Sequence, residues 1–343
     1  MLQNKFLSIL SAFIFVSVLS ACNNKLAVNE NQYTTHTFDS RGNQLSARLY
    51  IPKQHSVSDP IVIFVHGDGD MDSTANSFYL PIIDALNEQK IAAFSWDKPG
   101  VGSSGGDWLS QSMEDRAAEV QDAIDYLRAA GYQQNQIGVI GFSQASWVFA
   151  NLHNETEIKF MVLVGGAANW LSQSQYSMWI RLVDEGKINA DDETALERIK
   201  QLSEQEYHLI KSGYDKYLAA SLHQDPFMSE PLEDEARFNF VRKNIDADIS
   251  EGFSKLNLPM FAMYGDSDIH VDIEQSQTEF DYAFANSKQP LANLEQVVIS
   301  NATHGLLKPE LPLDALFSIK KSHFSPDAIE SMILWINSQR ETH

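Results

Sequence analysis

Short, continuous apolar runs that alternate with amphipathic segments are the feature that most constrains the fold of this chain. Four such runs, PIVIFVHG, KIAAFSWD, QIGVIGFS and IKFMVLVGG, occupy residues 60–67, 90–97, 136–143 and 158–166, and two more follow at 258–265 and 294–300. Runs without polar alternation are typical of parallel strands that helices cover on both faces. The pattern therefore predicts an α/β fold with a doubly wound, mostly parallel sheet.

The segments between the runs carry helix signals, which are clearest at residues 112–130. Ser112 and Asp115 have the spacing of a capping box, and Gly131 follows as a helix-ending residue. One face of this predicted helix is apolar and consists of Ala117, Val120, Ile124 and Leu127. Before the first run, YTTHTFDS and QLSARLYIP flank an Arg-Gly-Asn corner, which predicts a β-hairpin. A last helix is expected at about residues 325–340.

Residues 170–255 interrupt this alternation. They contain long charged stretches of helical character, such as DDETALERIKQLSEQEYHLIKSGYDKYLAASL, and no convincing strand. We interpret them as a helical insertion into one α/β unit rather than as a second independent domain. The core then consists of residues 33–169 and 256–343.

The N-terminus has the pattern of an export signal. Lys5 precedes an apolar run that is too short to span a bilayer comfortably. The run ends in LSAC, which resembles the lipobox of bacterial lipoprotein precursors, and Cys22 is the only cysteine of the chain. This resemblance implies cleavage of residues 1–21 as a signal peptide and lipidation of Cys22, with residues 22–32 as a tether. An ordinary signal peptide is the alternative.

The composition and the expected lipid anchor limit where in the cell the protein can be and which molecules it can bind. Asn23 after the cysteine favours the outer membrane of the bacterial cell envelope, by analogy with enteric bacteria. A single cysteine excludes an intramolecular disulfide, a thiolate metal cluster and a cysteine nucleophile. The formal net charge of −21 disfavours binding to nucleic acid and to anionic lipid headgroups, and it leaves neutral or cationic small substrates open. Membrane contact is expected through the lipid anchor at Cys22.

The segment GVIGFSQAS contains the sharpest local signal for catalysis. Gly141, Ser143 and Ala145 lie where a buried strand ends and a helical stretch begins, which is the context in which G-x-S-x-G marks a nucleophile elbow. Such a turn is crowded, so the positions two before and two after the serine must be small. Ala145 replaces the usual second glycine. The alternative is a serine that caps a helix.

A serine nucleophile needs a base, and the base needs an orienting acid. GDSDIHVD follows the run at 258–265, and NATHGLL follows the run at 294–300, so the chain offers Ser, Asp and His in that order after successive strands. With these motifs the chain from Tyr33 to the C-terminus resembles the α/β-hydrolase superfamily, especially bacterial esterases and serine-aminopeptidase-like hydrolases with a helical cap.

The resemblance implies an α/β-hydrolase fold and a role for each matching residue. Ser143 would be the nucleophile, His304 the general base and Asp268 the acid that orients it, while residues 170–255 would form the cap. The family's G-x-x-D pattern selects Asp268 over Asp266, which is expected to form a turn. No metal and no organic cofactor is implied.

Two other acidic or basic residues compete for these roles. Asp272 lies outside the G-x-x-D spacing that starts at Gly265. His270 is the rival base, although it lies on the same loop as the expected acid.

VHGDGDMDSTANSFY looks at first like a calcium-binding loop. It places aspartates at three alternate positions, 68, 70 and 72. A D-x-D-x-D calcium loop needs glycine at its sixth position and an acidic ligand at its twelfth. Ser73 and Tyr79 stand there, so the motif fails at both positions.

HGDG within this segment instead resembles the family's oxyanion loop. The resemblance implies that the backbone N–H groups of Gln144 and Asp68, with Gly69 as a substitute, stabilise the developing negative charge. Because a carboxylate would oppose that charge, the Asp68 side chain is expected to turn away. His66 belongs to the family's HG turn and is expected to be structural.

WDKPGVGSSGGDW contains a second misleading pattern. Gly100, Gly102 and Gly105 spell G-x-G-x-x-G after a strand, as in dinucleotide-binding folds. The next helix is predicted to begin only near Ser112, so a phosphate would not meet a helix N-terminus. The segment better resembles a structural turn that these hydrolases carry near the active site.

Four tryptophans, Trp108, Trp147, Trp170 and Trp179, lie on segments expected to border the nucleophile or the cap. Aromatic walls would suit an apolar acyl group or an aromatic leaving group. The other interpretation is that they pack the cap against the core.

The sequence therefore predicts a membrane-tethered serine hydrolase that cleaves small carboxylic esters through an acyl-enzyme. A peptidase or amidase of the same fold is the first alternative. The cap is rich in carboxylates that could bind a peptide amine, but these are expected to form a solvated helix face: Glu204, Glu206, Glu233 and Glu235. The second alternative is a non-catalytic lipoprotein that uses the fold for binding.

Overall fold

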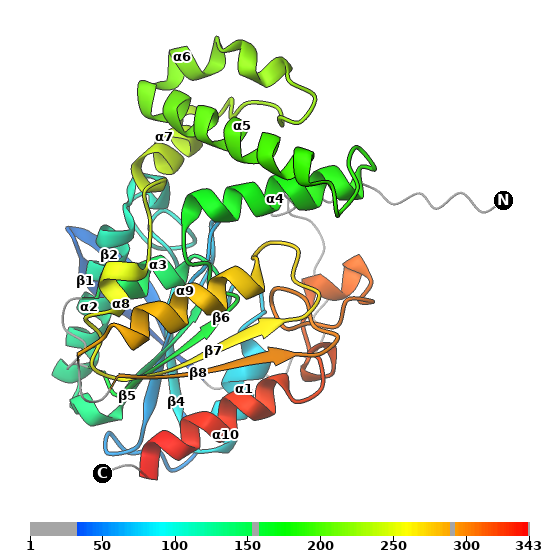
Figure 1. Ribbon diagram of the computed structural model, residues 1–343. Coiled ribbons are helices and arrows are strands. Elements are labelled where there is room, and N and C mark those ends of the chain that lie inside the picture. The colour runs from blue at the N-terminus through cyan, green and yellow to red at the C-terminus, as the bar shows by residue number, and fades with distance from the viewer. Residues whose placement is uncertain (1–32, 153–157, 289–291, 342–343) are drawn as a thin grey trace.

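An eight-stranded sheet forms the centre of the computed structural model, which describes residues 33–152, 158–288 and 292–341 (Figure 1). The expected signal peptide, lipidated cysteine and tether lie outside the described residues. Within these three ranges, no helix has the length and apolar character needed to cross a membrane.

The sheet has the strand order β1-β2-β4-β3-β5-β6-β7-β8. Its strands are β1 Tyr33–Ser40, β2 Asn43–Tyr50, β3 Ile61–Val65, β4 Ala92–Trp96, β5 Ile137–Phe142, β6 Phe160–Val164, β7 Pro259–Gly265 and β8 Asn293–Ile299. β1 and β2 form the expected antiparallel hairpin, β2 is also antiparallel to β4, and all neighbours from β4 to β8 are parallel. The predicted doubly wound, mostly parallel sheet is confirmed.

Helices cover both faces of the sheet. α1 Leu80–Glu88 and α10 Ala328–Glu341 pack on one face, and α2 Met113–Ala129, α3 Ala145–Ala150, α8 Ser250–Phe253 and α9 Ile273–Ala285 pack on the other. Short 3₁₀ turns include η1 Trp108–Ser110, η2 Gln134–Gln136, η4 Ser221–Gln224, η5 Leu313–Phe317 and η6 Lys321–His323.

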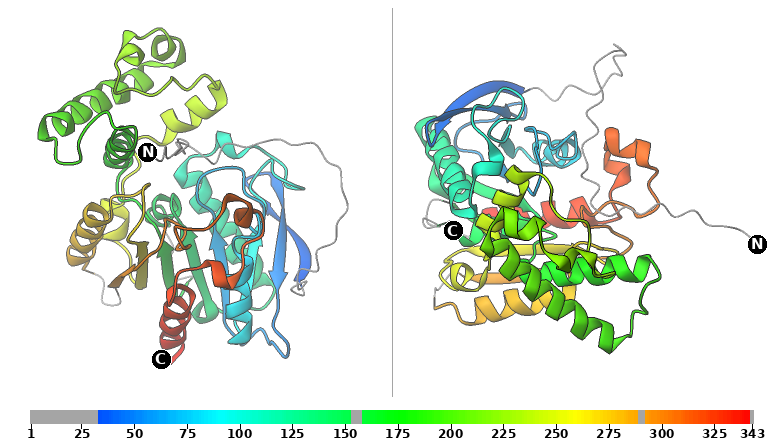
Figure 2. Two further views of the ribbon diagram at one scale, coloured as in Figure 1. Left: turned by 90° about the vertical axis from the view of Figure 1, so that its right-hand side faces the viewer. Right: turned by 90° about the horizontal axis from the view of Figure 1, so that it is seen from above.

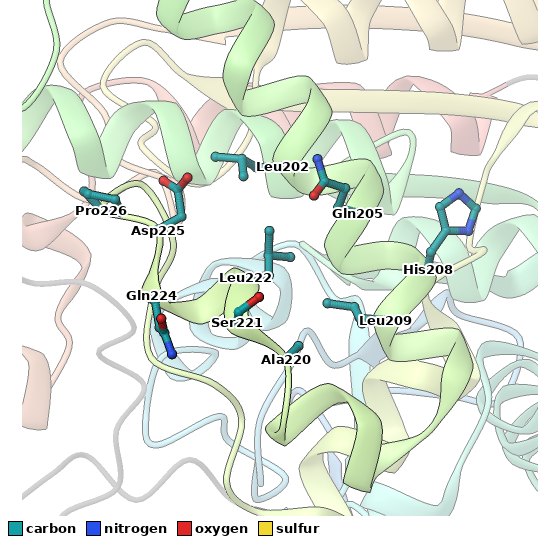
Figure 3. A pocket seen from close by; sticks show the side chains of 10 residues that line it. All are labelled: Leu202, Gln205, His208, Leu209, Ala220, Ser221, Leu222, Gln224, Asp225 and Pro226. Carbon is teal, nitrogen blue, oxygen red and sulfur yellow. The ribbon is translucent and has the colours of Figure 1, made fainter.

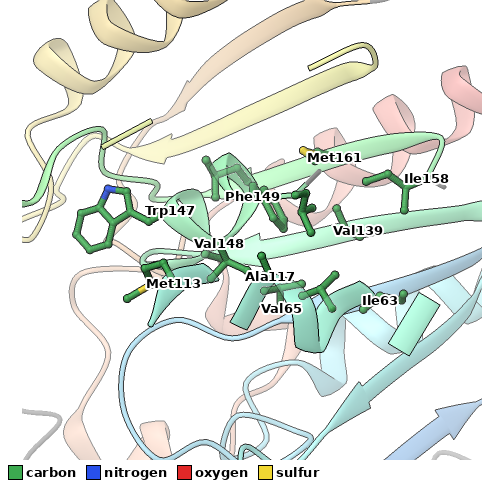
Figure 4. Packing of buried hydrophobic residues seen from close by; sticks show 14 of the residues in the cluster. Ile63, Val65, Met113, Ala117, Val139, Trp147, Val148, Phe149, Ile158 and Met161 are labelled. Atoms are coloured by element: carbon green, nitrogen blue, oxygen red, sulfur yellow. The ribbon is translucent and has the colours of Figure 1, made fainter. Parts of the chain in front are cut away.

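Strand β3 shows why the apolar runs lack polar alternation. Ile61, Ile63 and Val65 belong to the core under α2 and α3, and Figure 4 shows Ile63 and Val65 there. Val62 and Phe64 belong to the core under α1 and α10. All five side chains are buried. Each contributes about 1.5–3 kcal/mol when it leaves water, so a polar residue at any of these positions would be costly.

Helix α2 forms as its local signals predict. The Ser112 hydroxyl accepts the Asp115 N–H at 3.0 Å, and the Asp115 carboxylate accepts the Ser112 N–H at 2.8 Å. The four predicted apolar positions of this helix are buried. Gly131 follows with a φ of +107°, a conformation that favours glycine.

The interval 170–255 contains four longer helices, which we call the cap helices: α4 Trp170–Asp184, α5 Glu193–Ser212, α6 Tyr214–Leu218 and α7 Glu235–Asn244. They lie together on one side of the core (Figure 1, Figure 2). A small apolar core of their own contains Met178, Leu182, Ile188, Ala195, Ile199, Leu202 and Met228. Asn169 and Asp248 form a β-bridge at the two ends of the interval, so the cap leaves and rejoins the sheet between the neighbouring strands β6 and β7.

Candidate active site

Ser143 lies in a strained turn between β5 and α3. Its φ is +53°, and its N–H donates to the Val164 carbonyl at 2.8 Å. A Cβ atom at Gly141 would lie 2.7 Å from the Ala145 Cβ and 2.5 Å from the Phe149 ring. The turn is therefore as crowded as the elbow motif requires, and strain of this kind, which costs about 1–3 kcal/mol, clusters at functional sites.

The expected base and acid form a direct hydrogen bond. His304 follows β8, and its Nδ1 lies 2.7 Å from the Asp268 Oδ2 in the turn after β7. The Asp268 side chain is fully buried, whereas 21% of the His304 side chain is exposed. The Asp268 Oδ1 accepts the N–H groups of His270 at 2.7 Å and Val271 at 3.1 Å. The carboxylate is thus held on both oxygens and can orient the imidazole.

The pKa of Asp268 is lowered by this setting. Burial acts to raise the pKa, but the charge and hydrogen bond of His304 and the backbone N–H of His270 outweigh it. Asp268 is therefore a stable anion near neutral pH and can stabilise an imidazolium at His304.

The two competing residues have other partners. The Asp266 Oδ1 accepts the Ala302 N–H at 3.2 Å, in line with its expected turn role. The His270 ring packs edge-on against His304, with 5.1 Å between ring centroids. Burial, followed by the nearby His304, lowers the pKa of His270. Asp272 caps α9 by accepting the Gln275 N–H.

Glycines bring the expected nucleophile and base to one corner of the sheet. A Cβ atom at Gly165, the residue after β6, would lie 2.8 Å from the His304 Nδ1. Gly165 directly follows Val164, which holds the Ser143 N–H. On the other side, a Cβ atom at Gly67 would lie 3.3 Å from the Ser143 Cβ. The ends of β3, β5, β6, β7 and β8 thus meet at one edge of the sheet. In α/β folds the ligand crevice lies outside this edge.

The expected oxyanion loop lies against this elbow, and its carboxylate has a partner. Asp68 follows Gly67, which contacts the elbow. The two oxygens of Asp68 accept hydrogen bonds from both Nη atoms of Arg237 on α7, with 2.8 Å for the Nη1 to Oδ1 pair. The carboxylate is therefore directed to α7 of the cap.

Two buried basic side chains hold the backbone of the same loop. The Lys98 Nζ donates to the carbonyls of Gly67 and Gly69, each at 2.7 Å. Arg116 donates to the His66 carbonyl and, at 2.6 Å, to the Gln144 Oε1. These contacts fix the backbone of the loop beside the elbow.

Sequence reasoning did not find Lys98, Arg116 or Arg237. A signal existed for Arg116, since it lies on the buried face of α2 next to Ala117. Burial lowers the pKa of Lys98 well below its usual value, and the neighbouring Arg116 adds to that effect.

His66 is structural, as the resemblance implies. It is buried, its Nε2 lies 2.6 Å from the Trp96 carbonyl, and its Nδ1 lies 3.0 Å from the Tyr79 hydroxyl. Burial lowers its pKa to about 3, so the ring is neutral and donates to Trp96.

Asp68 and Asp72 of the apparent calcium loop bind different partners. Asp72 accepts the N–H groups of Thr74 at 2.9 Å and Asn76 at 3.0 Å, and Asp68 pairs with the cap. Among the described residues, no group of three or more His, Cys, Asp or Glu side chains could hold a metal ion. The glycine-rich segment forms turns, and α2 begins only at Met113, as predicted.

Two of the three tryptophan contacts join the cap to the core. Trp147 of α3 stacks on Trp170 of α4 with 4.9 Å between centroids, and Trp108 packs against Phe240 of α7 at 5.4 Å. Trp179 pairs with Tyr176 within α4.

Three of the four cap carboxylates that were expected to be solvated are exposed, but Glu206 is not. It lies 3.4 Å from the Tyr217 hydroxyl, and burial raises its pKa. A hollow in the cap, near α5 and η4, is lined by Leu202, Gln205, His208, Leu209, Ala220, Ser221, Leu222, Gln224, Asp225 and Pro226 (Figure 3). None of the expected catalytic residues lines it.

Comparisons with known proteins agree with the fold. The model of the Hydrolase_4 family, described as serine aminopeptidase S33, matches residues 56–310. No curated protein matches the chain.

Solved structures with the same fold include both esterases and a peptidase. Est1E from Butyrivibrio proteoclasticus with bound ferulic acid has 16% identity and a TM-score of 0.53, and the match covers 88% of this chain and 96% of that one. An esterase from Pyrococcus furiosus has 16% identity and a TM-score of 0.53, over 90% and 89% of the two chains. Proline iminopeptidase from Mycobacterium smegmatis has 12% identity and a TM-score of 0.56, over 90% and 99%. With most of its length matched by the family model, the chain belongs to the Hydrolase_4 family of hydrolases and has their α/β-hydrolase fold.

Proposed function

We propose that this protein is a serine hydrolase that cleaves small carboxylic esters through an acyl-enzyme on Ser143. The observation that carries the proposal is the hydrogen bond between Asp268 and His304 beside a strained serine turn. A buried, doubly anchored carboxylate that orients a partly exposed histidine is the arrangement general-base catalysis requires.

The proposed reaction gives each of these groups one role. The Ser143 Oγ attacks the ester carbonyl while the His304 Nε2 takes its proton, and Asp268 stabilises the imidazolium. The N–H groups of Gln144 and Asp68, with Gly69 as a substitute, stabilise the tetrahedral oxyanion, and each such donor is worth about 2.7–4 kcal/mol in related sites. His304 returns the proton to the leaving alcohol, and water releases the acyl group by the same route. No metal or organic cofactor takes part in this scheme.

A peptidase is the second candidate because the family description names an aminopeptidase. An aminopeptidase must bind the free amine of its substrate, for which a carboxylate near the crevice is the usual partner. Asp68 lies on the expected oxyanion loop, but Arg237 already occupies both of its oxygens. Glu204, Glu233 and Glu235 of the cap are exposed to solvent. These contacts favour an ester, and the esterase among the similar folds is consistent with that choice.

Covalent labelling tests the proposal. A fluorophosphonate probe should modify Ser143, as located by mass spectrometry, and the adduct should vanish in Ser143→Ala. Nitrophenyl esters of increasing acyl length, compared with aminoacyl nitroanilides, then separate the esterase from the peptidase. A folded protein that takes up no label would exclude the enzyme and leave the binding lipoprotein.

We also propose that the chain is anchored in the bacterial envelope through lipid on Cys22, with the hydrolase core facing the periplasm or the exterior. The support is the LSAC sequence and the single cysteine. Metabolic labelling with palmitate should mark the wild type but not Cys22→Ala, and membrane fractionation should locate the labelled protein. Palmitate on neither protein would refute the anchor.

A further inference from the structure

Three basic side chains hold the oxyanion loop in the described part of the chain. Lys98 and Arg116 belong to the core and bind the loop's carbonyls. Arg237 belongs to the cap and binds the Asp68 carboxylate, 169 residues away in sequence. The first two contacts join parts of the core to each other, whereas the third joins the core to α7 of the cap.

Two aromatic rings and the Asp68 carboxylate hold the Arg237 guanidinium in this position. It lies over the rings of Phe240 at 5.0 Å and Trp108 at 5.9 Å, one from the cap and one from the core. Its backbone N–H donates to the Asp234 carboxylate, which caps α7. The bidentate contact with Asp68 is the strongest geometry for this pair of groups. Only 31% of the Arg237 side chain and 40% of the Asp68 side chain are exposed.

Asp68 is an unusual residue for an oxyanion loop. Its backbone N–H is an expected donor to the oxyanion, and its own carboxylate carries the charge that would oppose the same oxyanion. Burial acts to raise the pKa of Asp68, but Arg237, followed by the nearby Lys98 and the Gly69 N–H, outweighs this effect and keeps the pKa lowered. The residue therefore stays ionised, and Arg237 is the charged side chain that binds its carboxylate directly.

The cap also contacts the loop that carries the expected acid, Asp268. The Tyr176 hydroxyl of α4 donates to the Asp268 carbonyl at 3.0 Å, and the Gln173 side chain donates to the His270 carbonyl at 3.3 Å. The cap therefore contacts the acid loop through α4 and the oxyanion loop through α7.

We propose that Arg237 is a positioning residue that makes the oxyanion loop competent when the cap is seated, by neutralising and holding the Asp68 carboxylate. The inference rests on the proposed serine hydrolase function. In this proposal the cap affects the rate of the chemical step, in addition to any effect on the shape of the substrate site. With the cap displaced, an unpaired anion would lie beside the developing oxyanion.

Steady-state kinetics with a nitrophenyl ester tests this coupling in the full chain. Arg237→Gln should lower kcat by about 10- to 100-fold with a change in KM below about threefold, because an uncompensated charge acts on the transition state. In an Asp68→Asn background the same substitution should change kcat by less than about threefold, because the charge is already absent. Arg237→Lys should retain a higher kcat than Arg237→Gln, since lysine keeps the positive charge but cannot make the bidentate contact. Arg242→Gln, an exposed arginine on the same helix, is the matched control and should leave kcat unchanged.

Two outcomes would overturn the inference. One is a kcat unaffected by Arg237→Gln. The other is an equal loss in both backgrounds, which would mean that Arg237 only supports the cap. Ser143→Ala, measured alongside, separates the hypotheses: residual activity in that variant refutes the proposed function, whereas an inactive Ser143→Ala with an unaffected Arg237→Gln refutes the coupling alone.

Discussion

Replacement of Asp268 by asparagine should inactivate the protein without unfolding it. The two backbone N–H groups of His270 and Val271 donate to the Oδ1 of Asp268. In Asp268→Asn they would hold the amide oxygen in that place, so the NH₂ group would face His304. The Nδ1 of His304 would then have to accept a hydrogen bond, and its Nε2 would carry the proton. A histidine protonated at Nε2 cannot accept the proton of Ser143.

The expected loss follows from this wrong tautomer. For a triad of this geometry the decrease in kcat is about 10⁴-fold, equivalent to about 5.4 kcal/mol of transition-state stabilisation. The change is isosteric and the side chain keeps its two backbone donors, so the melting temperature should change little. Initial rates with a nitrophenyl ester measure kcat, and circular dichroism during heating measures stability.

Asp266→Asn is the matched control, since Asp266 lies two residues away and binds the Ala302 N–H rather than His304. Its kcat should stay within about threefold of the wild type. The argument would be refuted if Asp268→Asn kept more than about a tenth of the wild-type kcat, or if Asp266→Asn lost more activity than Asp268→Asn did.

Three further predictions test the surroundings of the site. Gly141→Val should lower the free energy of unfolding by about 1–3 kcal/mol, because its Cβ would lie 2.5 Å from the Phe149 ring. Chemical denaturation measures this effect, and fluorophosphonate labelling of Ser143 should decrease as well. Lys98→Met should lower kcat by about tenfold or more while the melting temperature stays level or rises, because it releases two loop carbonyls but removes a buried charge; a fall in melting temperature with unchanged kcat would contradict this role. The pKa of Asp68 is lowered from 3.8 in the fold, so its ionised carboxylate should stabilise the protein fully above about pH 4 and lose this effect as the pH falls below that value. The melting temperature should therefore decline less from pH 6 to pH 3 in Asp68→Asn than in the wild type.

The expected acid, base and nucleophile were predictable because each follows its own strand. Parallel strands place their carboxyl ends at one edge of the sheet, so residues that are local in sequence meet in space. The elbow around Ser143, the G-x-x-D turn of Asp268 and the HG turn of His66 each depend on a few neighbouring residues. The capping box of α2 is local in the same way.

The surroundings of these residues were decided by the tertiary structure. Whether Lys98 binds Gly67, or Arg237 binds Asp68, depends on contacts between segments 31 and 169 residues apart. No short pattern encodes such a pair, because it forms only after the sheet and the cap have packed. Glu206 illustrates the same limit: its helix pattern predicts a solvated face, but contact with Tyr217 leaves it only partly exposed.

The sequence alone thus determined the order of strands and helices, the doubly wound sheet and the residues expected to react, since these follow from local periodicity and short turns. The tertiary structure decided how the oxyanion loop is held, where the Asp68 charge goes and how the cap contacts the acid loop and the oxyanion loop. The physical reason is that a hydrogen bond or ion pair needs its partners within about 3 Å in a defined orientation. Distant segments reach that precision only through the packing of the whole fold.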